Sequence, residues 1–175
     1  MTYYAIITNG KIDGKGQCLC SGDNTFSVEI TEEVYDNIEQ YIWTGSEIAL
    51  NPDYDNILLE QKKAEKVELN DTLRDTALLS GVTYQNVLFD SDTDQKINLL
   101  ATVNMMSDTD TITWYGKDNQ GLLCTKADLM AIGGLITELH SYCWNMNAYI
   151  KEQIAGAETI EKLDNIEINY DRTDT

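Results

Sequence analysis

A long segment near the C-terminus constrains the fold more than any other feature of the sequence. From Thr125 to about Ala155 there is no proline, and apolar residues recur at three- and four-residue intervals. Thr125 and Asp128 resemble a capping box at its start, and Gly156 is the expected helix stop. A helix of this length spans roughly 46 Å at about 1.5 Å per residue. The C-terminal half of the chain must therefore be arranged around one long helix.

A second helix is predicted over residues 53–80. The stretch from Asp55 to Leu79 contains no glycine or proline and is rich in residues that favour helix. Its apolar residues form only a thin, broken stripe. They are Ile57, Leu58, Ala64, Val67, Leu69, Leu73 and Ala77. A stripe this thin favours an exposed linker helix or a short coiled-coil strand over a helix buried in a core.

The first 52 residues are predicted to form a small β-rich module. Asn9-Gly10 is a strong turn signal for a hairpin, and Thr31 has the pattern of a helix N-cap. A second hairpin over residues 41–50 is expected to close the module.

Residues 81–166 are predicted to form a second domain. Hairpin turns are expected at residues 85–86 and 116–121, and Ser91 or Asp92 should cap a helix. The inward face of that helix is predicted to carry Ile97, Leu100, Ala101 and Met105.

The expected fold class is therefore α+β. It has a β-rich N-terminal module at residues 1–52, a linker helix at 53–80, and a domain of short β-hairpins packed on a long helix at 81–166. Residues 167–175 are expected to be a frayed polar tail. Tight approach of another backbone is expected at Gly133-Gly134, because glycine within a helix is otherwise unfavourable.

The composition narrows the possible functions and locations. With 30 acidic and 12 basic side chains, the net charge of −18 disfavours binding to nucleic acid. No run of about 18 apolar residues is present, so membrane insertion is not expected. The first ten residues lack the pattern of a signal peptide, so we expect synthesis in the cytosol. Four cysteines, Cys18, Cys20, Cys124 and Cys143, match no zinc-binding spacing and are expected to be reduced thiols.

No group of residues has the pattern of an active site or a metal site. His140 and Cys143 are separated by one helical turn, but the sequence offers no orienting group or oxyanion hole. The series Asp90, Asp92, Asp94 resembles half of a calcium loop, but the later glycine and glutamate positions hold other residues. We expect a packed histidine, capping aspartates, no cofactor and no enzymatic activity.

The sequence contains an ordered set of residues that resembles the pattern of a known family. The C-terminal part of this pattern is Thr125-x-x-Asp128-Leu129, then His140, then Ile154-x-x-Ala157-x-Thr159-Ile160-x-x-Leu163-x-x-Ile166. The N-terminal part comprises Tyr84, Phe89, Asp90, Asp92, Asn98, Trp114, Asp118 and Asn119. Over residues 73–166 the ordered set resembles the uncharacterised C-terminal domain of tail-fibre and tail-fibre-assembly-like proteins of tailed bacteriophages. The segment Ile30-Thr31-Glu32-Glu33-Val34-Tyr35 is followed by Tyr41-Ile42-Trp43. With this segment, residues 2–56 look, more loosely, like small N-terminal modules of Gram-positive phage baseplate proteins. The family has no established catalytic residues to carry over.

The resemblance implies a structural component of a bacteriophage tail or baseplate. Such a protein would attach or position a tail fibre or receptor-binding protein, and would be carried in the tail of the virion. One alternative is an assembly chaperone for the tail fibre that is absent from the mature particle. A second alternative is an acidic DNA mimic that inhibits a host nuclease.

The long helix also has a face that could bind a partner. Its residues follow a 4-3-4-3 spacing typical of a coiled-coil seam. They are Leu135, Leu139, Tyr142, Met146 and Tyr149. With the adjoining apolar stripe, this face is wider than one stripe of a domain core requires. The sequence therefore predicts a homo-oligomer or a virion partner at this face. The trimeric symmetry of tail fibres favours a trimer.

Overall fold

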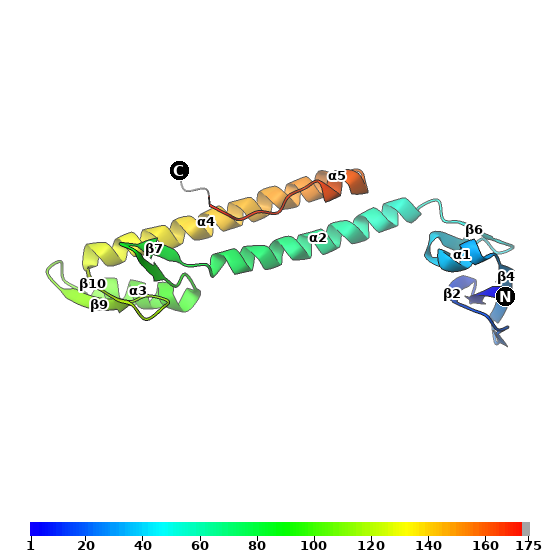
Figure 1. The fold of residues 1–175 in the computed structure, drawn as a ribbon, viewed down its shortest axis with the longest axis horizontal. Coiled ribbons are helices and arrows are strands. Elements are labelled where there is room, and N and C mark those ends of the chain that lie inside the picture. The colour runs from blue at the N-terminus through cyan, green and yellow to red at the C-terminus, as the bar shows by residue number, and fades with distance from the viewer. Residues whose placement is uncertain (173–175) are drawn as a thin grey trace. The chain divides into compact units, whose positions relative to one another are not determined.

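The computed structural model describes residues 1–172 and divides into two compact units, Met1–Gln61 and Lys62–Thr175. The division falls within one helix, α2 (Tyr54–Leu78), whose ends correspond to the predicted segment 53–80. Both units combine helices with antiparallel strands (Figure 1). The α+β fold class predicted from the sequence is confirmed.

The first unit is built on a four-stranded sheet in the order β2-β1-β4-β3. Its strands are β1 (Tyr3–Thr8), β2 (Lys11–Gly16), β3 (Ser21–Gly22) and β4 (Thr25–Ile30). Asn9 and Gly10, which join β1 to β2, have φ angles of 51° and 76°, as a tight turn of this kind requires. Ala5 and Ile7 on β1 are fully buried and form the core of the sheet.

Short elements complete the first unit. They are α1 (Glu32–Asp36), the 3-10 helix η1 (Ile38–Gln40), β5 (Tyr41–Trp43) and β6 (Ile48–Leu50). Thr31 caps α1 by accepting a hydrogen bond from the backbone N–H of Val34, which confirms the predicted cap. The predicted hairpin over residues 41–50 is also confirmed, because β5 pairs with β6.

The second unit has two hairpins at one end of its long helices. The strands β7 (Val82–Tyr84) and β8 (Val87–Phe89) form one hairpin, and β9 (Thr111–Tyr115) and β10 (Gly121–Thr125) form the other. Gly116 lies where the two hairpins meet, since a Cβ at this position would lie 2.5 Å from the Leu88 carbonyl oxygen. The next residue, Lys117, donates a backbone hydrogen bond of 2.7 Å to that same carbonyl.

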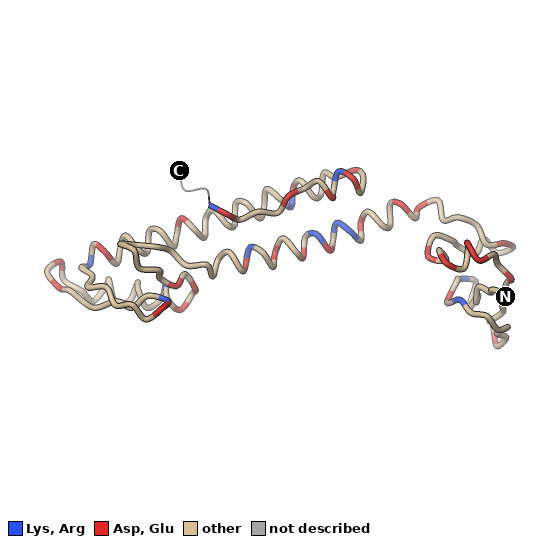
Figure 2. Tube along the Cα trace, viewed as in Figure 1, with Lys and Arg blue, Asp and Glu red and all other residues tan. Residues whose placement is uncertain are grey.

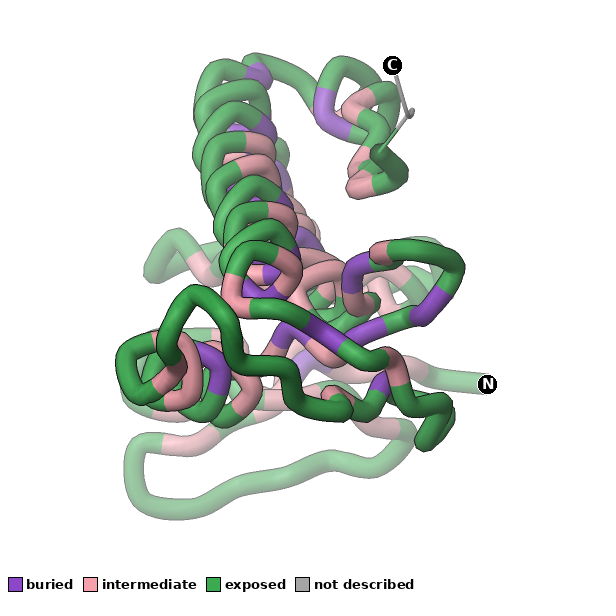
Figure 3. The backbone as a smooth tube through the Cα atoms, turned by 90° about the vertical axis from the view of Figure 1, so that its left-hand side faces the viewer, coloured by how far each residue is buried: buried purple, intermediate pink, exposed green. Residues whose placement is uncertain are grey.

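The long helix α4 (Lys126–Gly156) forms the spine of the second unit. The predicted capping box is confirmed, because Thr125 and Asp128 each accept a hydrogen bond from the backbone of the other. Tyr84 donates a 2.7 Å hydrogen bond to Asp128, which ties the first hairpin to the start of α4. Buried positions follow one side of the helix (Figure 3). They are Leu129, Ile132, Ile136, Leu139, Cys143, Asn147, Ile150 and Ile154.

The C-terminal segment is anchored rather than frayed, up to the last described residue. Thr159 caps the short helix α5 (Ile160–Asp164), which Figure 1 shows beside the end of α4. Lys66 on α2 donates a 2.7 Å hydrogen bond to the Leu163 carbonyl. Farther along, the Tyr170 hydroxyl donates a 2.7 Å hydrogen bond to the Asn70 side chain. The prediction of a frayed tail is therefore wrong at residues 167–172, and residues 173–175 lie outside the described part of the chain.

The helix α3 (Thr93–Met105) turns a different face to the core from the one predicted. Leu99 is its buried residue, whereas Ile97 and Leu100 are 59% and 62% exposed and Met105 is 87% exposed. Gly133 on α4 explains this choice, because a Cβ there would lie 3.0 Å from a methyl carbon of Leu99. The absent side chain at this glycine leaves room for Leu99. The tight approach predicted at Gly133-Gly134 thus occurs at the first glycine, against a side chain, while the second glycine faces open space.

Candidate partner-binding site

The predicted interface on α4 is largely covered by the chain itself. Leu139 is only 3% exposed, and Leu135 and Tyr142 are half-buried beside the core. Met146 is also half-buried, and Tyr149, at 59% exposed, is the one residue of the five that lies open.

The covering residues come from α2 and from the C-terminal segment. Leu73 and Ala77 of α2 and Tyr170 line one hollow together with Leu135 and Leu139. The five-residue seam therefore does not need a partner from outside the chain, contrary to the reasoning from the sequence. Leu73 and Ala77, the last two residues of the thin apolar stripe, face this hollow, so the second half of α2 is part of the second unit rather than an exposed linker. Self-association remains a prediction, but the five-residue seam on α4 no longer supports it.

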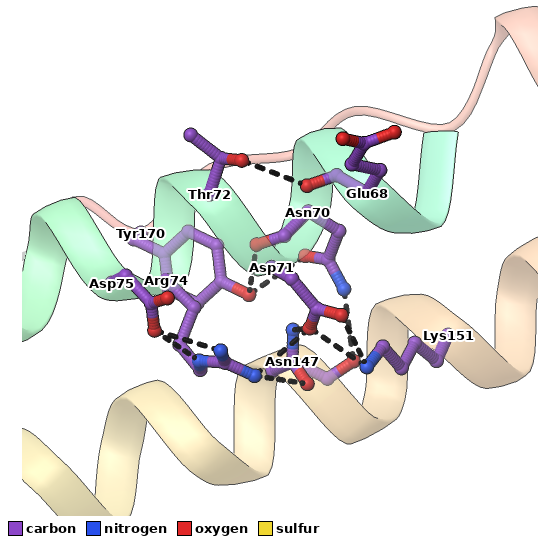
Figure 4. Close-up of polar contacts among 9 residues, drawn as sticks. All are labelled: Glu68, Asn70, Asp71, Thr72, Arg74, Asp75, Asn147, Lys151 and Tyr170. Carbon is purple, nitrogen blue, oxygen red and sulfur yellow. Dashed lines mark hydrogen bonds and ion pairs between the residues drawn. The ribbon is translucent and has the colours of Figure 1, made fainter. Parts of the chain in front are cut away.

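A polar cluster joins α2 to α4 (Figure 4). We call it the α2–α4 polar cluster, and its members are Asn70, Asp71, Arg74, Asn147, Lys151 and Tyr170. Asn70 is fully buried, and its side-chain amide donates a 3.1 Å hydrogen bond to the backbone carbonyl of Asn147. Asn147 is 4% exposed, and its own amide donates a 2.9 Å hydrogen bond to Asp71. Buried amides with partners on both helices fix how the two helices pair.

Charged groups complete this cluster. Asp71 accepts from Lys151 at 2.7 Å and from Arg74 at 2.8 Å. The hydrogen bond from Lys151 holds the pKa of Asp71 below its usual value, against the opposing effect of burial. Arg74 also lies 4.3 Å from the ring centroid of Trp144, a cation–π contact on the outer side of the pair. All these groups satisfy one another, which indicates a structural cluster rather than a reactive site.

The sequence contains one signal for this cluster. Buried positions on α4 recur at three- and four-residue intervals, and Asn147 is the only polar one among them. A single buried asparagine in an apolar seam typically specifies one pairing at a cost in stability. Asn147 interrupts the apolar stripe where α4 meets Asn70 and Asp71 of α2.

The histidine and the buried cysteine do not form a catalytic pair. The His140 Nε2 lies 2.7 Å from the Ser91 carbonyl oxygen, so this nitrogen donates and carries the proton. Nδ1 then accepts from Lys96, 3.4 Å away. Both ring nitrogens are thus engaged away from Cys143, and burial raises the pKa of the Cys143 thiol, which disfavours the nucleophilic thiolate.

The aspartates at residues 90–94 serve the hairpin and α3. Asp92 caps α3 by accepting a 2.7 Å hydrogen bond from the backbone N–H of Gln95, as predicted. Asp90 faces Lys117 at 3.8 Å. Within residues 1–172, no three His, Cys, Asp or Glu side chains are grouped so that they could hold a metal ion.

An apolar groove between α3 and α4 is one surface feature that internal contacts leave open. We call it the α3–α4 groove, and its volume is about 540 Å³. Leu99 and Ile136 form its buried floor. Ile97, Leu100 and Met130 line it and are 59%, 62% and 60% exposed. Apolar concavities of this kind are typical of sites that bind a ligand or a partner protein.

The fold and these sites define an α+β protein with a paired-helix unit and an exposed apolar groove. Residues 61–170 match the model of a family described as a domain of unknown function, DUF4376. The match spans more than half of the chain, so the chain belongs to this family. No curated protein and no solved structure matches the chain. In the described part of the chain, no helix has both the length and the apolar character needed to cross a membrane.

Proposed function

We propose that the chain is a structural component of a bacteriophage tail or baseplate that attaches or positions a tail fibre or receptor-binding protein. It would be made in the host cytoplasm and carried in the tail of the particle. The proposal needs a protein partner and neither a cofactor nor an enzymatic activity.

The observation that carries this proposal is the structural role of the residues that resemble the tail-protein domain. Tyr84 and Asp128 tie a hairpin to α4, and His140 bonds to the carbonyl of Ser91. Thr159 caps α5. These four resembling residues thus make contacts that hold one folded unit together, as expected of a domain inherited as a whole.

The internal contacts and burial of the potentially reactive side chains support a non-enzymatic role. His140 and Asp92 are engaged in internal contacts, and Cys124 and Cys143 are buried thiols whose pKa values burial raises. The α3–α4 groove, in contrast, offers exposed apolar surface of the kind that a protein partner covers.

Two rival roles predict different properties. A tail-fibre chaperone would have similar surfaces but would be absent from the finished particle. A DNA mimic would need its acids in paired rows, and here Asp92, Asp128 and Asp71 serve instead as helix caps or as part of the α2–α4 polar cluster. The mimic is therefore the less favoured rival.

An in-frame deletion of the gene in the genome that encodes this chain tests the proposal. We expect electron micrographs of the deletion particles to show tails that lack fibres or receptor-binding proteins. A plasmid copy of the gene should restore both the missing structures and infectivity. Particles of normal appearance and normal infectivity from the deletion strain would contradict the proposal.

A further inference from the structure

The helix α3 carries two apolar stripes, and the chain covers only one of them. The inner stripe contains buried Leu99 and half-buried Val103, which pack toward α4 and the core. The outer stripe contains Ile97 and Leu100, which are one helical turn apart and 59% and 62% exposed. The two apolar stripes lie on different sides of the helix. When the inner stripe packs against the core, the outer stripe is therefore left facing solvent.

The outer stripe is one wall of the α3–α4 groove, and α4 provides the other. Met130 is 60% exposed on the far wall, while Gly133 and Ile136 lie between the walls. Three large side chains more than half exposed around one concavity form a contiguous apolar surface, unlike scattered exposed residues. The residues of α3 that line the groove run from Thr93 to Val103, so its length suits a helical segment of about three turns.

Acidic residues stand at both ends of α3, the helix that forms one wall of the groove (Figure 2). Asp92 and Asp94 lie at the N-terminal end of α3 beside Thr93, which lines the groove. Asp108 and Asp110 follow its C-terminal end, and the side chain of Asp108 is 95% exposed. The residues that line the groove include no acid, but a partner that extends along α3 beyond the groove meets carboxylates near both ends of this helix.

Two lysines near the groove, Lys96 and Lys126, offset part of this charge, which leaves four aspartates against two lysines. Lys96 lines the groove but is directed to the Nδ1 atom of His140, 3.4 Å away. Lys126 donates to the Met106 carbonyl and lies 3.7 Å from one carboxylate oxygen of Asp108. A second copy of this chain would bring the same acids and a net charge of −18 to this surface, which opposes self-docking.

We propose that the α3–α4 groove binds an amphipathic helix of a partner protein. The helix presents apolar side chains at positions i, i+4 and i+7 and carries lysine or arginine at its ends. Its apolar face covers Ile97, Leu100 and Met130, and its basic ends lie against the acidic residues at the ends of α3. This assignment deepens the proposed function, because it gives the tail partner a docking surface and a chemistry.

Fluorescence anisotropy with designed peptides tests this proposal on the full chain. The probes are helical peptides of about 16 residues, which would span α3, with leucine or phenylalanine at the anchor positions and lysine at both ends. We expect saturable one-to-one binding to the wild-type chain that weakens as salt is added. A peptide of the same composition with its apolar face scrambled should not bind. A peptide with glutamate in place of lysine should bind at least about tenfold more weakly.

A matched pair of variants places the binding in the groove. Leu100→Ser removes an exposed leucine of the groove, and Leu69→Ser removes one that is 50% exposed on α2, far along the sequence. Both positions are exposed, so both variants should fold. We expect about tenfold weaker binding for Leu100→Ser, since one buried leucine contributes about that much or more. Binding should be unchanged for Leu69→Ser.

Three results would overturn the proposal. One is no binding by any apolar, lysine-flanked peptide; another is equal weakening by both variants. The third is a doubled mass of the wild-type chain in analytical ultracentrifugation that Leu100→Ser abolishes, because a second copy would then occupy the groove. Peptide binding together with a normal deletion phenotype would contradict only the tail function. A fibre-less deletion phenotype without peptide binding would contradict only the groove assignment.

Discussion

Replacing Asn147 with alanine should destabilise the second unit through the α2–α4 polar cluster. The substitution removes a 2.9 Å hydrogen bond to the carboxylate of Asp71 and a longer contact of 3.4 Å from Arg74. Hydrogen bonds to charged groups contribute about 1.5–3 kcal/mol each, and the longer contact contributes less. Since Asn147 is 4% exposed, water cannot readily replace the lost partner. We expect a loss of about 2–4 kcal/mol in the free energy of unfolding.

The matched control is Asn145→Ala, two residues away on the same helix. Asn145 is exposed, so its substitution removes no buried hydrogen bond. Both substitutions gain the same helix propensity, at most about 0.7 kcal/mol, and this gain cancels when the two variants are compared. The difference between the variants therefore isolates the contribution of the cluster.

Urea unfolding followed by circular dichroism at 222 nm measures this difference. The signal at 222 nm reports helix content, and α2 and α4, with 25 and 31 residues, supply most of the helical residues of the chain. A double variant with Asp71→Ala should lose less stability than the two single variants added together, because both remove the same hydrogen bond. Equal stability of Asn147→Ala and Asn145→Ala would refute the pairing role of the cluster.

Three further predictions use the same kind of comparison. Leu99→Ala should lower the free energy of unfolding by about 2–5 kcal/mol, whereas Leu100→Ala should change it by less than about 1 kcal/mol; urea titrations giving equal losses would contradict the observed orientation of α3. Gly116→Ala should lower the melting temperature, because its Cβ would overlap a carbonyl oxygen. Gly134→Ala faces open space and should raise the melting temperature, because alanine favours helix over glycine by up to about 1 kcal/mol. Calorimetry that shows the reverse order would be inconsistent with the hairpin contact. The pKa of Asp71 is lowered in the folded state, so its carboxylate stabilises the fold above its unfolded pKa of about 3.9, and this stabilisation is lost as pH falls through the lower folded value. Asp71→Asn should therefore flatten this part of the plot of unfolding free energy against pH. An unchanged plot would contradict the ion pair with Lys151.

Local signals in the sequence were sufficient for three helix starts and for the first hairpin turn. Thr31, Asp92 and Thr125 all cap helices, because capping depends on residues only a few positions apart. The turn at Asn9-Gly10 also follows from local preference for positive φ angles.

The choice of buried face on α3 could not be read from the sequence in the same way. The stripe with Ile97 and Leu100 and the stripe with Leu99 and Val103 are both apolar, so periodicity alone does not rank them. The deciding contact is between Leu99 and Gly133, residues on two different helices. Only the packed structure shows that the space above this glycine admits Leu99.

The covering of the α4 seam was missed for a related reason. The apolar residues of α2 make a thin stripe, which by itself indicates an exposed helix. In the structure polar contacts supplement that stripe, since Asn70 and Asp71 reach Asn147 and Tyr170 bonds to Asn70. Apolar periodicity does not detect a pairing that depends partly on buried amides.

The composition of purified particles tests the tail proposal most directly. Particles are separated on two successive density gradients, and the chain and the major tail protein are quantified by mass spectrometry against labelled reference peptides. We predict that the chain remains with the particles through both gradients in a fixed ratio to the tail protein. Its absence from the particles, with abundant chain in the lysate, would contradict a structural role in the tail.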